Sequence, residues 1–479
     1  MEWLALLMFI CVCLVLLTGY PVAFSLAGTG ILFAMIGVQM ELIHPAILKN
    51  AGSRLFGIIQ NPTLIAVPLF IFMGGILEKA KIADNLLNGI ARLMGEKPSG
   101  LGVSVILVGA LLAASTGIVG ATVVTMGLIS LPVMLKKGYS PSLASGIICA
   151  SGTLGQIIPP SIVLVLLGDV IASANRDVGM GNDPISVGDL FAGALIPGFI
   201  LVGMYILYLL FLSKFSPAQF GANLPVEDSH PINSREEKSI VDSQQDNKNT
   251  ADKTHFSSQS KLQALKVIIA PLALIFLVLG SIMSGVATPT EAAAVGASGA
   301  LLLAILNRQL NLKNLTSVMR STTRTSSMIF MILIGASIFS LVFRAFNGDD
   351  AIENILANLP GGLPTAMLVV MLTMFVLGFI LDFIEIVFVV VPLTAPALIA
   401  LGADPIWLGV MIAVNLQTSF LTPPFGFALF YLRGVAPKTV KTENIYKGVM
   451  PFIGIQVLLL ILLAIYPQIT TWLPSIIYS

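Results

Sequence analysis

Long apolar runs alternate with short polar segments along most of the chain. Each run approaches the ~20 residues that an α-helix needs to cross the hydrocarbon core of a bilayer. We therefore predict spanning helices at residues 3–18, 21–38, 63–79, 191–213, 265–283, 290–306, 326–343 and 449–466. The pattern indicates an all-α integral membrane protein.

Residues 216–261 interrupt this pattern. They are rich in Ser, Asn, Gln, Asp and Lys and contain few apolar side chains. Such a segment cannot bury enough apolar surface to offset the entropy that is lost when its chain becomes ordered. We predict a disordered cytoplasmic linker between two membrane-embedded halves.

Four prolines and one glycine recur in the second half at a constant offset of 264 residues (396 − 132 = 264). The pairs are Pro132 and Pro396, Gly138 and Gly402, Pro141 and Pro405, Pro159 and Pro423, and Pro160 and Pro424. Further upstream, Pro21 and Gly28 resemble Pro289 and Gly296 at an offset of 268. This register predicts an internal duplication.

The charges that flank two equivalent segments have opposite sign. The segment 99–135 has basic flanks, at Arg92, Lys97, Lys136 and Lys137. The segment 362–400 has acidic flanks, at Asp349, Asp350, Glu353 and Asp404. Because cytoplasmic loops carry an excess of Lys and Arg, the first segment begins and ends inside and the second begins and ends outside. We predict inverted repeats with two re-entrant helical hairpins, and both termini outside.

These boundaries divide the chain into predicted parts with different roles. They are scaffold helices and a connecting arm (1–62), a first transport half (63–190, with hairpin 99–135 and broken helix 141–172), a scaffold helix (191–215), the linker (216–261), further scaffold helices and an arm (262–325), a second transport half (326–448, with hairpin 362–400 and broken helix 405–432) and a C-terminal helix (449–479).

A Pro-Pro pair interrupts the helix that follows each hairpin, in SGTLGQIIPPS (151–161) and NLQTSFLTPPF (415–425). Proline removes a backbone donor and clashes with the preceding turn. Unwound backbone at membrane depth survives where it is buried or lines a cavity, and its carbonyl oxygens suit Na⁺. Matching broken helices in inverted repeats are typical of secondary transporters. The alternative is a pair of kinks that only shape packing.

The hairpin tips carry the other candidate chemistry. The first tip has hydroxyls at Ser115 and Thr116, and Gly117 permits a tight reversal. Small-residue helix packing is the alternative reading of that tip. The second tip has Asp382 and Glu385 in an apolar run without a basic partner. An intramembrane carboxylate costs at least ~2.5 kcal/mol at a helix centre, which favours a functional role over a merely solvated tip.

Three strings resemble the large membrane subunit of tripartite ATP-independent periplasmic (TRAP) transporters: GTLGQIIPPS, ATPTEAAAVGA (287–297) and LTPPFGFALFYLRG (421–434). The first tip and the linker resemble the branch labelled mannitol/chloroaromatic. The resemblance implies a sodium-driven elevator transporter in the bacterial inner membrane. It also implies two partners, a small four-helix membrane subunit and a periplasmic binding protein that delivers an organic acid.

The resemblance places sodium ligands at both tips and both broken helices. These are Ser115, Thr116, Gly117, Ser151, Gly152, Thr153, Asp382, Asn415, Gln417, Thr418, Ser419 and Thr422. Residues near the substrate are Thr122, Gln156, Pro159, Pro160, Glu385, Pro423 and Pro424. Many family members resemble GxSGSAxAD at the first tip, and the aspartate of that string falls at Thr122, so this chain lacks that carboxylate.

Composition narrows the function classes further. Of 479 residues 10% are charged, and the net charge of +1 gives no sign of a nucleic-acid partner. The cysteines show no metal-ligand spacing, and no phosphate-binding GxxxxGK[ST] loop occurs. We therefore expect an ion gradient to supply the energy and no cofactor besides the coupling ion, Na⁺.

Three other function classes stay open on sequence alone. A stand-alone sodium/dicarboxylate symporter of related fold usually shows Ser-Asn-Thr at both tips, which this chain lacks. An intramembrane enzyme needs a catalytic set, such as Ser with His or paired Asp, and no histidine lies in a predicted span. A passive channel does not need inverted broken helices.

Overall fold

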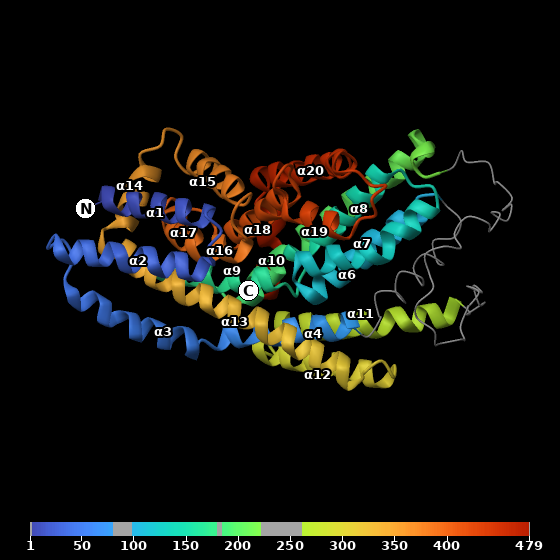
Figure 1. The fold of residues 1–479 in the computed structure, drawn as a ribbon, viewed down its shortest axis with the longest axis horizontal. Helices are drawn as coiled ribbons and strands as arrows, with labels where there is room; N and C mark the ends of the chain where they lie inside the picture. Colours follow the sequence, from blue (N-terminus) through green and yellow to red (C-terminus); the bar gives the residue numbers. More distant parts are fainter. Residues whose placement is uncertain (1, 80–97, 180–183, 222–260, 479) are drawn as a thin grey trace, which may run out of the picture.

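The computed structural model describes residues 2–79, 98–179, 184–221 and 261–478 (Figure 1). The side chains of 113–116 and 261–268 are outside this description. Regular structure in the described residues is helical, apart from one isolated bridge between Tyr139 and Phe220. The all-α prediction is therefore confirmed over this part of the chain.

The helices of the first half are α1 (Glu2–Leu17), α2 (Val22–Gln39), η1 (Pro45–Lys49), α3 (Asn50–Gln60), α4 (Pro62–Lys79), α6 (Gly100–Thr116), α7 (Val119–Lys136), α8 (Pro141–Thr153), η2 (Leu154–Gln156), α9 (Ile162–Asp177), α10 (Val187–Phe215) and η3 (Pro217–Gln219). Those of the second half are α11 (Lys261–Met283), α12 (Pro289–Leu306), α13 (Leu312–Ala345), α14 (Gly348–Ala357), α15 (Leu363–Leu377), α16 (Phe383–Val389), α17 (Val391–Ala400), α18 (Pro405–Leu421), α19 (Phe427–Val435), α20 (Thr442–Ile465) and α21 (Gln468–Ile477).

Within the described residues, 8 helical stretches are long and apolar enough to cross a membrane. They are α2, α4, α7, α10, α12, α13, α16 with α17, and α20. Every predicted spanning segment lies in a helix, with 3–18 in α1 and 265–283 in α11. The remaining two stretches, α7 and α16–α17, are the second arms of the predicted hairpins. Both are long enough to cross a membrane, so their length does not distinguish a re-entrant hairpin from a spanning helix.

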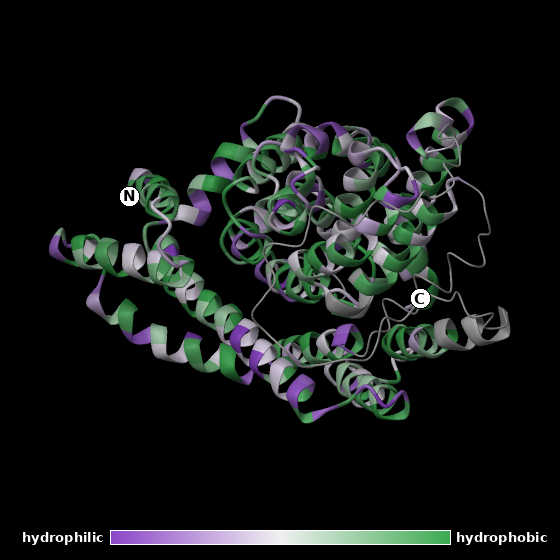
Figure 2. Cartoon of the chain, turned by 45° about the vertical axis from the view of Figure 1, so that its right-hand side comes forward, coloured by the Kyte–Doolittle hydropathy of each residue, from purple (hydrophilic) through white to green (hydrophobic). Residues whose placement is uncertain are grey.

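The helices form an elongated outer group and a compact bundle. The long helix α13 packs along α2, α4 and α3, and α12 packs on α4, as Figure 1 shows. The helices α6 to α10 and α15 to α20 pack mainly on one another in the bundle. Figure 2 shows that apolar residues predominate along the helices of both groups. Large apolar side chains such as Phe24 of α2 and Phe199 of α10 are exposed, as expected where lipid replaces water.

Equivalent caps begin the helices α8 and α18. Ser140 Oγ accepts from Leu143 N at 3.2 Å, and Asp404 Oδ1 accepts from Trp407 N at 2.8 Å. A proline occupies the first turn of each helix, where its missing N–H costs no hydrogen bond. A glycine with positive φ precedes each cap by two residues, at Gly138 (+84°) and Gly402 (+98°).

A glycine–glycine crossing joins α8 to α20. A Cβ on Gly146 would collide with the carbonyl oxygen of Gly448, and a Cβ on Gly448 would collide with that of Ser142. Only glycine lets two helix backbones approach this closely. The crossing therefore fixes α20 directly on the helix that leads into the first Pro-Pro pair.

The first residues of the predicted linker are folded. Phe220 is buried and its ring lies 5.2 Å from that of Tyr139, edge to face. Ser140 N donates to Gln219 O at 2.8 Å. One aromatic side chain thus anchors residues 216–221, a segment of polar average composition, to the bundle. The rest of the predicted linker, 222–260, lies outside the described residues.

Candidate functional site

Both Pro-Pro pairs interrupt helices. Helical structure stops at Gln156 and resumes at Ile162, and it stops at Leu421 and resumes at Phe427. A proline donates no hydrogen bond to the carbonyl four residues earlier. The carbonyls that lose a helical donor in this way are those of Gly155, Gln156, Ser419 and Phe420. Two of them have another donor: Gln156 O accepts from Ser161 Oγ at 3.3 Å, and Ser419 O accepts from Thr422 N at 3.1 Å. Each break therefore offers backbone oxygen atoms inside the bundle.

The two broken helices meet at a buried polar contact. Gln417 Nε2 donates to Thr153 Oγ1 at 3.3 Å, and both side chains are fully buried. Gln417 Oε1 and both polar side-chain atoms of Gln156 are buried and have no hydrogen-bond partner among the described residues. A buried amide without a partner costs free energy, so this cluster is suited to a ligand that completes its hydrogen bonds.

The tip of the first helix–turn–helix rests on the first broken helix. Gly117 has φ of +61°, and a Cβ there would lie 2.8 Å from Cγ1 of Ile162, the first residue of α9. A Cβ on Gly109 would lie 2.5 Å from that of Ser151. Gly152 lies against Val123 of α7 in the same way. The side chains of Ser115 and Thr116 are outside the described residues.

Asp382 and Glu385 form a capping box at the start of α16. Asp382 Oδ1 accepts from Phe383 N at 2.7 Å, and Glu385 Oε2 accepts from Asp382 N at 3.1 Å. In the part of the chain that the structure covers, neither carboxylate forms an ion pair. Both carboxylates therefore have a structural role, since they supply acceptors for the first turn of the helix.

The second helix–turn–helix rests on the second broken helix. Asn415 Nδ2 donates to Met371 O of α15 at 2.8 Å. The turn residue Gly378 lies so close to Ser419 that a Cβ would collide with its hydroxyl. The structure therefore brings Ser419 to this turn and Asn415 to the middle of α15, as it brings Ser151 and Gly152 to the first hairpin.

The hydroxyl groups of both broken helices donate to carbonyls of their own helix, one turn earlier. The pairs are Ser151 to Ile148, Thr153 to Ala150, Thr418 to Val414, Ser419 to Leu416 and Thr422 to Thr418. A hydroxyl oxygen that has donated keeps lone pairs that can accept. These oxygens and the freed carbonyls are the hard ligands that a sodium ion requires.

Thr122 lies inside the first helix–turn–helix. It is buried, and its hydroxyl donates to Ile118 O at 3.3 Å. Within the ranges described above, no group of three or more His, Cys, Asp or Glu side chains is placed to hold a metal ion. The candidate ligands for a cation are thus mostly neutral oxygens.

Sequence reasoning missed two polar contacts that cross between helices. Thr125 Oγ1 donates to Glu78 Oε1 at 2.9 Å, which joins α7 to α4. Asn61 Nδ2 donates to both carboxylate oxygens of Asp169, at 3.1 and 3.0 Å, which joins the start of α4 to α9. Glu78 lies at the end of the predicted span 63–79, where a charged residue is expected to face water, so its contact with Thr125 was not predicted. Asp169, however, stands alone in the apolar run IVLVLLGDVIA, the signal that identified Asp382.

Comparisons with known proteins agree with the resemblance of the three strings. A family model described as the DctM component of tripartite ATP-independent periplasmic transporters matches residues 9–469. The C4-dicarboxylate TRAP transporter large permease protein DctM of Rhodobacter capsulatus is 29% identical over 477 residues, which cover 99% of each chain. The ectoine TRAP transporter large permease protein TeaC of Halomonas elongata is 26% identical, with 97% of each chain covered. The sialic acid TRAP transporter large permease protein SiaM of Vibrio cholerae is also 26% identical, with 96% covered.

A solved structure gives independent evidence about the fold. The YdaH transporter of Alcanivorax borkumensis matches with a TM-score of 0.59 at 14% identity over 88% of each chain. The family model spans nearly the whole chain, and its members are transporter permeases rather than enzymes. This protein belongs to the DctM family of TRAP transporter large permeases, multi-pass proteins of the bacterial inner membrane.

Proposed function

We propose that this permease carries an organic acid across the inner membrane by a sodium-coupled elevator mechanism. It works with a small four-helix membrane subunit and with a periplasmic binding protein that delivers the substrate. The observation that carries the proposal is the meeting of two broken helices at Thr153 and Gln417, beside the unpartnered amide of Gln156.

The elevator rests on the proposed inverted repeat. In both halves a helix–turn–helix precedes a capped helix, a Pro-Pro break and a further helix, in the same order. The flanking charges of the two helix–turn–helix units have opposite sign. In an arrangement of this kind both turns reach the breaks from opposite faces, and the segments move as one body against the outer helices.

Sodium binds at each turn in this scheme. The first ion is held by 115–117 and by the oxygens of 151–156, and the second by Asp382 and the oxygens of 415–422. Each ion ties a hairpin tip to its broken helix and so completes the substrate site between them. Linkage requires that substrate and Na⁺ then raise each other's affinity by the same factor.

The substrate class follows from relatives of this chain. Their names specify C4-dicarboxylates, ectoine and sialic acid, and we assign this chain a small organic acid as substrate. The mannitol/chloroaromatic branch label rests on the tip STGIVG and on the long linker. Thr122, Gln156, Glu385 and the four break prolines lie at or beside the proposed substrate site.

The test is uptake by the reconstituted permease together with its membrane partner and binding protein. We expect uptake of the delivered acid to require an inward sodium gradient and to stop when the gradient is dissipated by an ionophore. Uptake that ignores Na⁺ and follows a proton gradient would overturn the sodium mechanism and make Asp382 and Glu385 the proton carriers. Strong uptake by the permease alone would favour the stand-alone symporter instead.

A further inference from the structure

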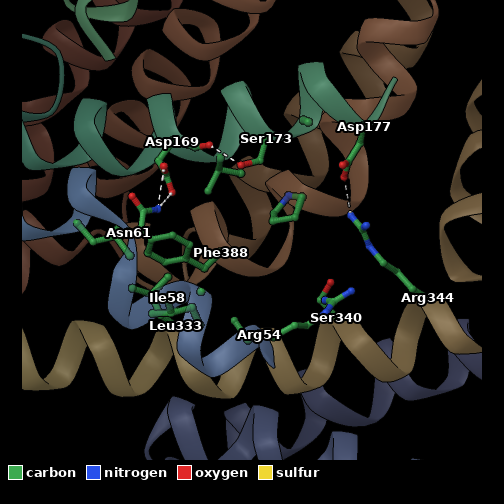
Figure 3. Close-up of a pocket in the computed structure, with 17 residues that line it drawn as sticks. Arg54, Ile58, Asn61, Asp169, Ser173, Asp177, Leu333, Ser340, Arg344 and Phe388 are labelled. Carbon is green, nitrogen blue, oxygen red and sulfur yellow. Dashed lines mark hydrogen bonds and ion pairs between the residues drawn. The ribbon is translucent and has the colours of Figure 1, made fainter. Parts of the chain in front are cut away.

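A cavity of about 370 Å³ lies between α3, the start of α4, α9, α13 and α16–α17 (Figure 3). Its volume falls within the roughly 300–1,000 Å³ of small-molecule sites. None of its lining residues belongs to the predicted sodium or substrate positions. The cavity therefore needs its own explanation.

Two helices supply the facing walls. Asp169, Ser173 and Asp177 follow one another at four-residue intervals on α9 and share one face of that helix. Ser340 and Arg344 line the opposite wall from α13, as Figure 3 shows. The arm helix α3 closes a third side and contributes Arg54.

The acidic groups of the cavity already have partners. Asp169 accepts two hydrogen bonds from Asn61, at 3.1 and 3.0 Å. Asp177 pairs with Arg344 at 3.1 Å, and Arg344 also pairs with Asp349 at 3.0 Å. The cavity thus has no unpaired carboxylate among the described residues that would attract a cation.

Arg54 is the group without a partner. Among the residues that the structure describes, it forms neither a hydrogen bond nor an ion pair within 4.0 Å, although a guanidinium has five donors. Burial, and then the positive charge of Arg344, lower the pKa of Arg54. The hydroxyls of Ser337 and Ser340, which also line the cavity, likewise form no hydrogen bond to a described residue. These side chains are half-buried, and their donors are free to bind an acceptor from a ligand.

We propose that this cavity is a second binding site, for the carboxylate group of a small organic acid, with Arg54 as its guanidinium ligand and Ser337 and Ser340 as hydroxyl partners. The cavity lining carries two arginines, Arg54 and Arg344, and two carboxylates, Asp169 and Asp177, so its formal charge is zero. Asp349, which pairs with Arg344, lies outside the lining and makes the wider cluster −1. Such a lining holds an anion weakly, as a site from which the ligand moves on requires.

The position of the cavity suggests a role for the site in transport, and this role rests on the proposed function. In the predicted topology, the acidic flanks place the end of α13 on the extracytoplasmic side. Phe388 and Pro392, in the second arm of the second helix–turn–helix, line the cavity. The acid released by the binding protein would wait here before it enters the site between the breaks.

Chemical protection tests binding without transport. The permease, purified with its membrane partner, is treated with phenylglyoxal, and modification of each arginine is measured by peptide mass spectrometry. We expect succinate, used as the probe carboxylate, to slow modification of Arg54 severalfold relative to chloride at equal ionic strength. Arg320, which is exposed at the other end of α13, serves as the reference. Equal rates at Arg54 with succinate and chloride, or equal slowing at both arginines, would overturn the proposal.

Transport kinetics provide the second measurement. Arg54→Gln should raise the apparent KM for the delivered acid roughly tenfold, as expected for the loss of one charge-assisted hydrogen bond. Arg54→Lys should restore part of the loss, because it keeps the charge but not the bidentate geometry. Lys49→Gln, an exposed cation of the same arm outside the cavity, should leave KM unchanged. An unchanged KM in Arg54→Gln would refute the site. Protection without sodium-driven uptake would refute only the proposed function.

Discussion

Gln417 and Thr153 bind each other, Nε2 to Oγ1 at 3.3 Å, and they stand 264 residues apart, which is the offset of the two Pro-Pro pairs. Under a two-fold rotation, equivalent positions contact each other only at the axis. On the proposed inverted repeat, that axis passes between these two side chains. It therefore runs through the candidate site, where the two halves share one polar cluster.

Replacing Gln156 by Leu should change the stability and the transport activity of the permease in opposite directions. Each buried polar group without a partner costs about 1–3 kcal/mol, so Gln156→Leu should raise the melting temperature of the purified permease. Uptake should fall, because the amide that we assign to the ligand is gone. Gln456→Leu is the control, since this buried glutamine of α20 bonds Tyr205 away from both breaks, and its uptake should stay near wild type. A less stable Gln156→Leu with normal uptake would contradict the assignment.

Asp382→Asn tests whether the negative charge of Asp382 contributes to sodium binding, separately from its role as the N-cap of α16. Asn caps a helix about as well as Asp, so expression and melting temperature should change little. The sodium concentration for half-maximal uptake should rise roughly tenfold, equivalent to about 1.4 kcal/mol of binding free energy. Glu385→Gln keeps the capping box and should have a smaller effect on sodium. Identical sodium dependence in wild type and Asp382→Asn would remove Asp382 from the ion site.

The ion pair between Arg344 and Asp177 joins α13 to the end of α9. Both side chains are partly exposed, so neutralising Asp177 should lower stability by less than about 1 kcal/mol. Neutralising Arg344 also removes its pair with Asp349 and should have a larger effect. If α9 slides past α13 during transport, the same changes should alter the uptake rate, and a double-mutant cycle should show coupling. Lys447 and Glu443 form a pair within one helix, α20, and their neutralisation should leave uptake unchanged. Equal effects of the two pairs on uptake would argue against sliding at α9.

Labelling of single cysteines tests the inverted topology. Cysteines at Lys137 and Asn358, both exposed and each next to one helix–turn–helix, should react with an impermeant maleimide from opposite sides of the membrane. Gly402 is a poor position for this purpose, because a side chain is strained at its φ of +98°. Reaction of both cysteines from one side would exclude the inverted arrangement.

The polar linker divides into an anchored start and a remainder that we expect to be dispensable. Removing residues 224–258 and inserting a short flexible bridge should leave uptake close to wild type. Phe220→Ala should instead destabilise the protein by about 3 kcal/mol, since it empties a buried aromatic site. Loss of uptake in a well-expressed deletion would show a specific role for the removed segment.

Local features of the sequence predicted the fold well. Apolar run length predicted six of the 8 stretches that are long and apolar enough to cross a membrane. The Pro-Pro pairs identified the breaks, because a missing N–H acts on its own helix wherever it occurs. The string Asp382-x-x-Glu385 also carries the capping-box spacing, yet we interpreted it only as intramembrane charge. The contact of Thr153 with Gln417 and the pairing of Asp169 with Asn61 depend on helix packing between distant segments, which no local pattern specifies. The packing of Phe220 was not predicted, because the linker was assigned from the average composition of residues 216–261, in which a single aromatic residue has little weight.

At the contact of Gly146 with Gly448 the backbones of α8 and α20 touch, and no side chain separates the two helices. We therefore expect α8 and α20 to move together. A fluorophore on the exposed side of α20, at Leu458 for example, would report movement of the first break from the lipid face, where labelling does not disturb the site. In the proposed elevator mechanism, its distance to a second dye on α12 would measure how far the bundle moves.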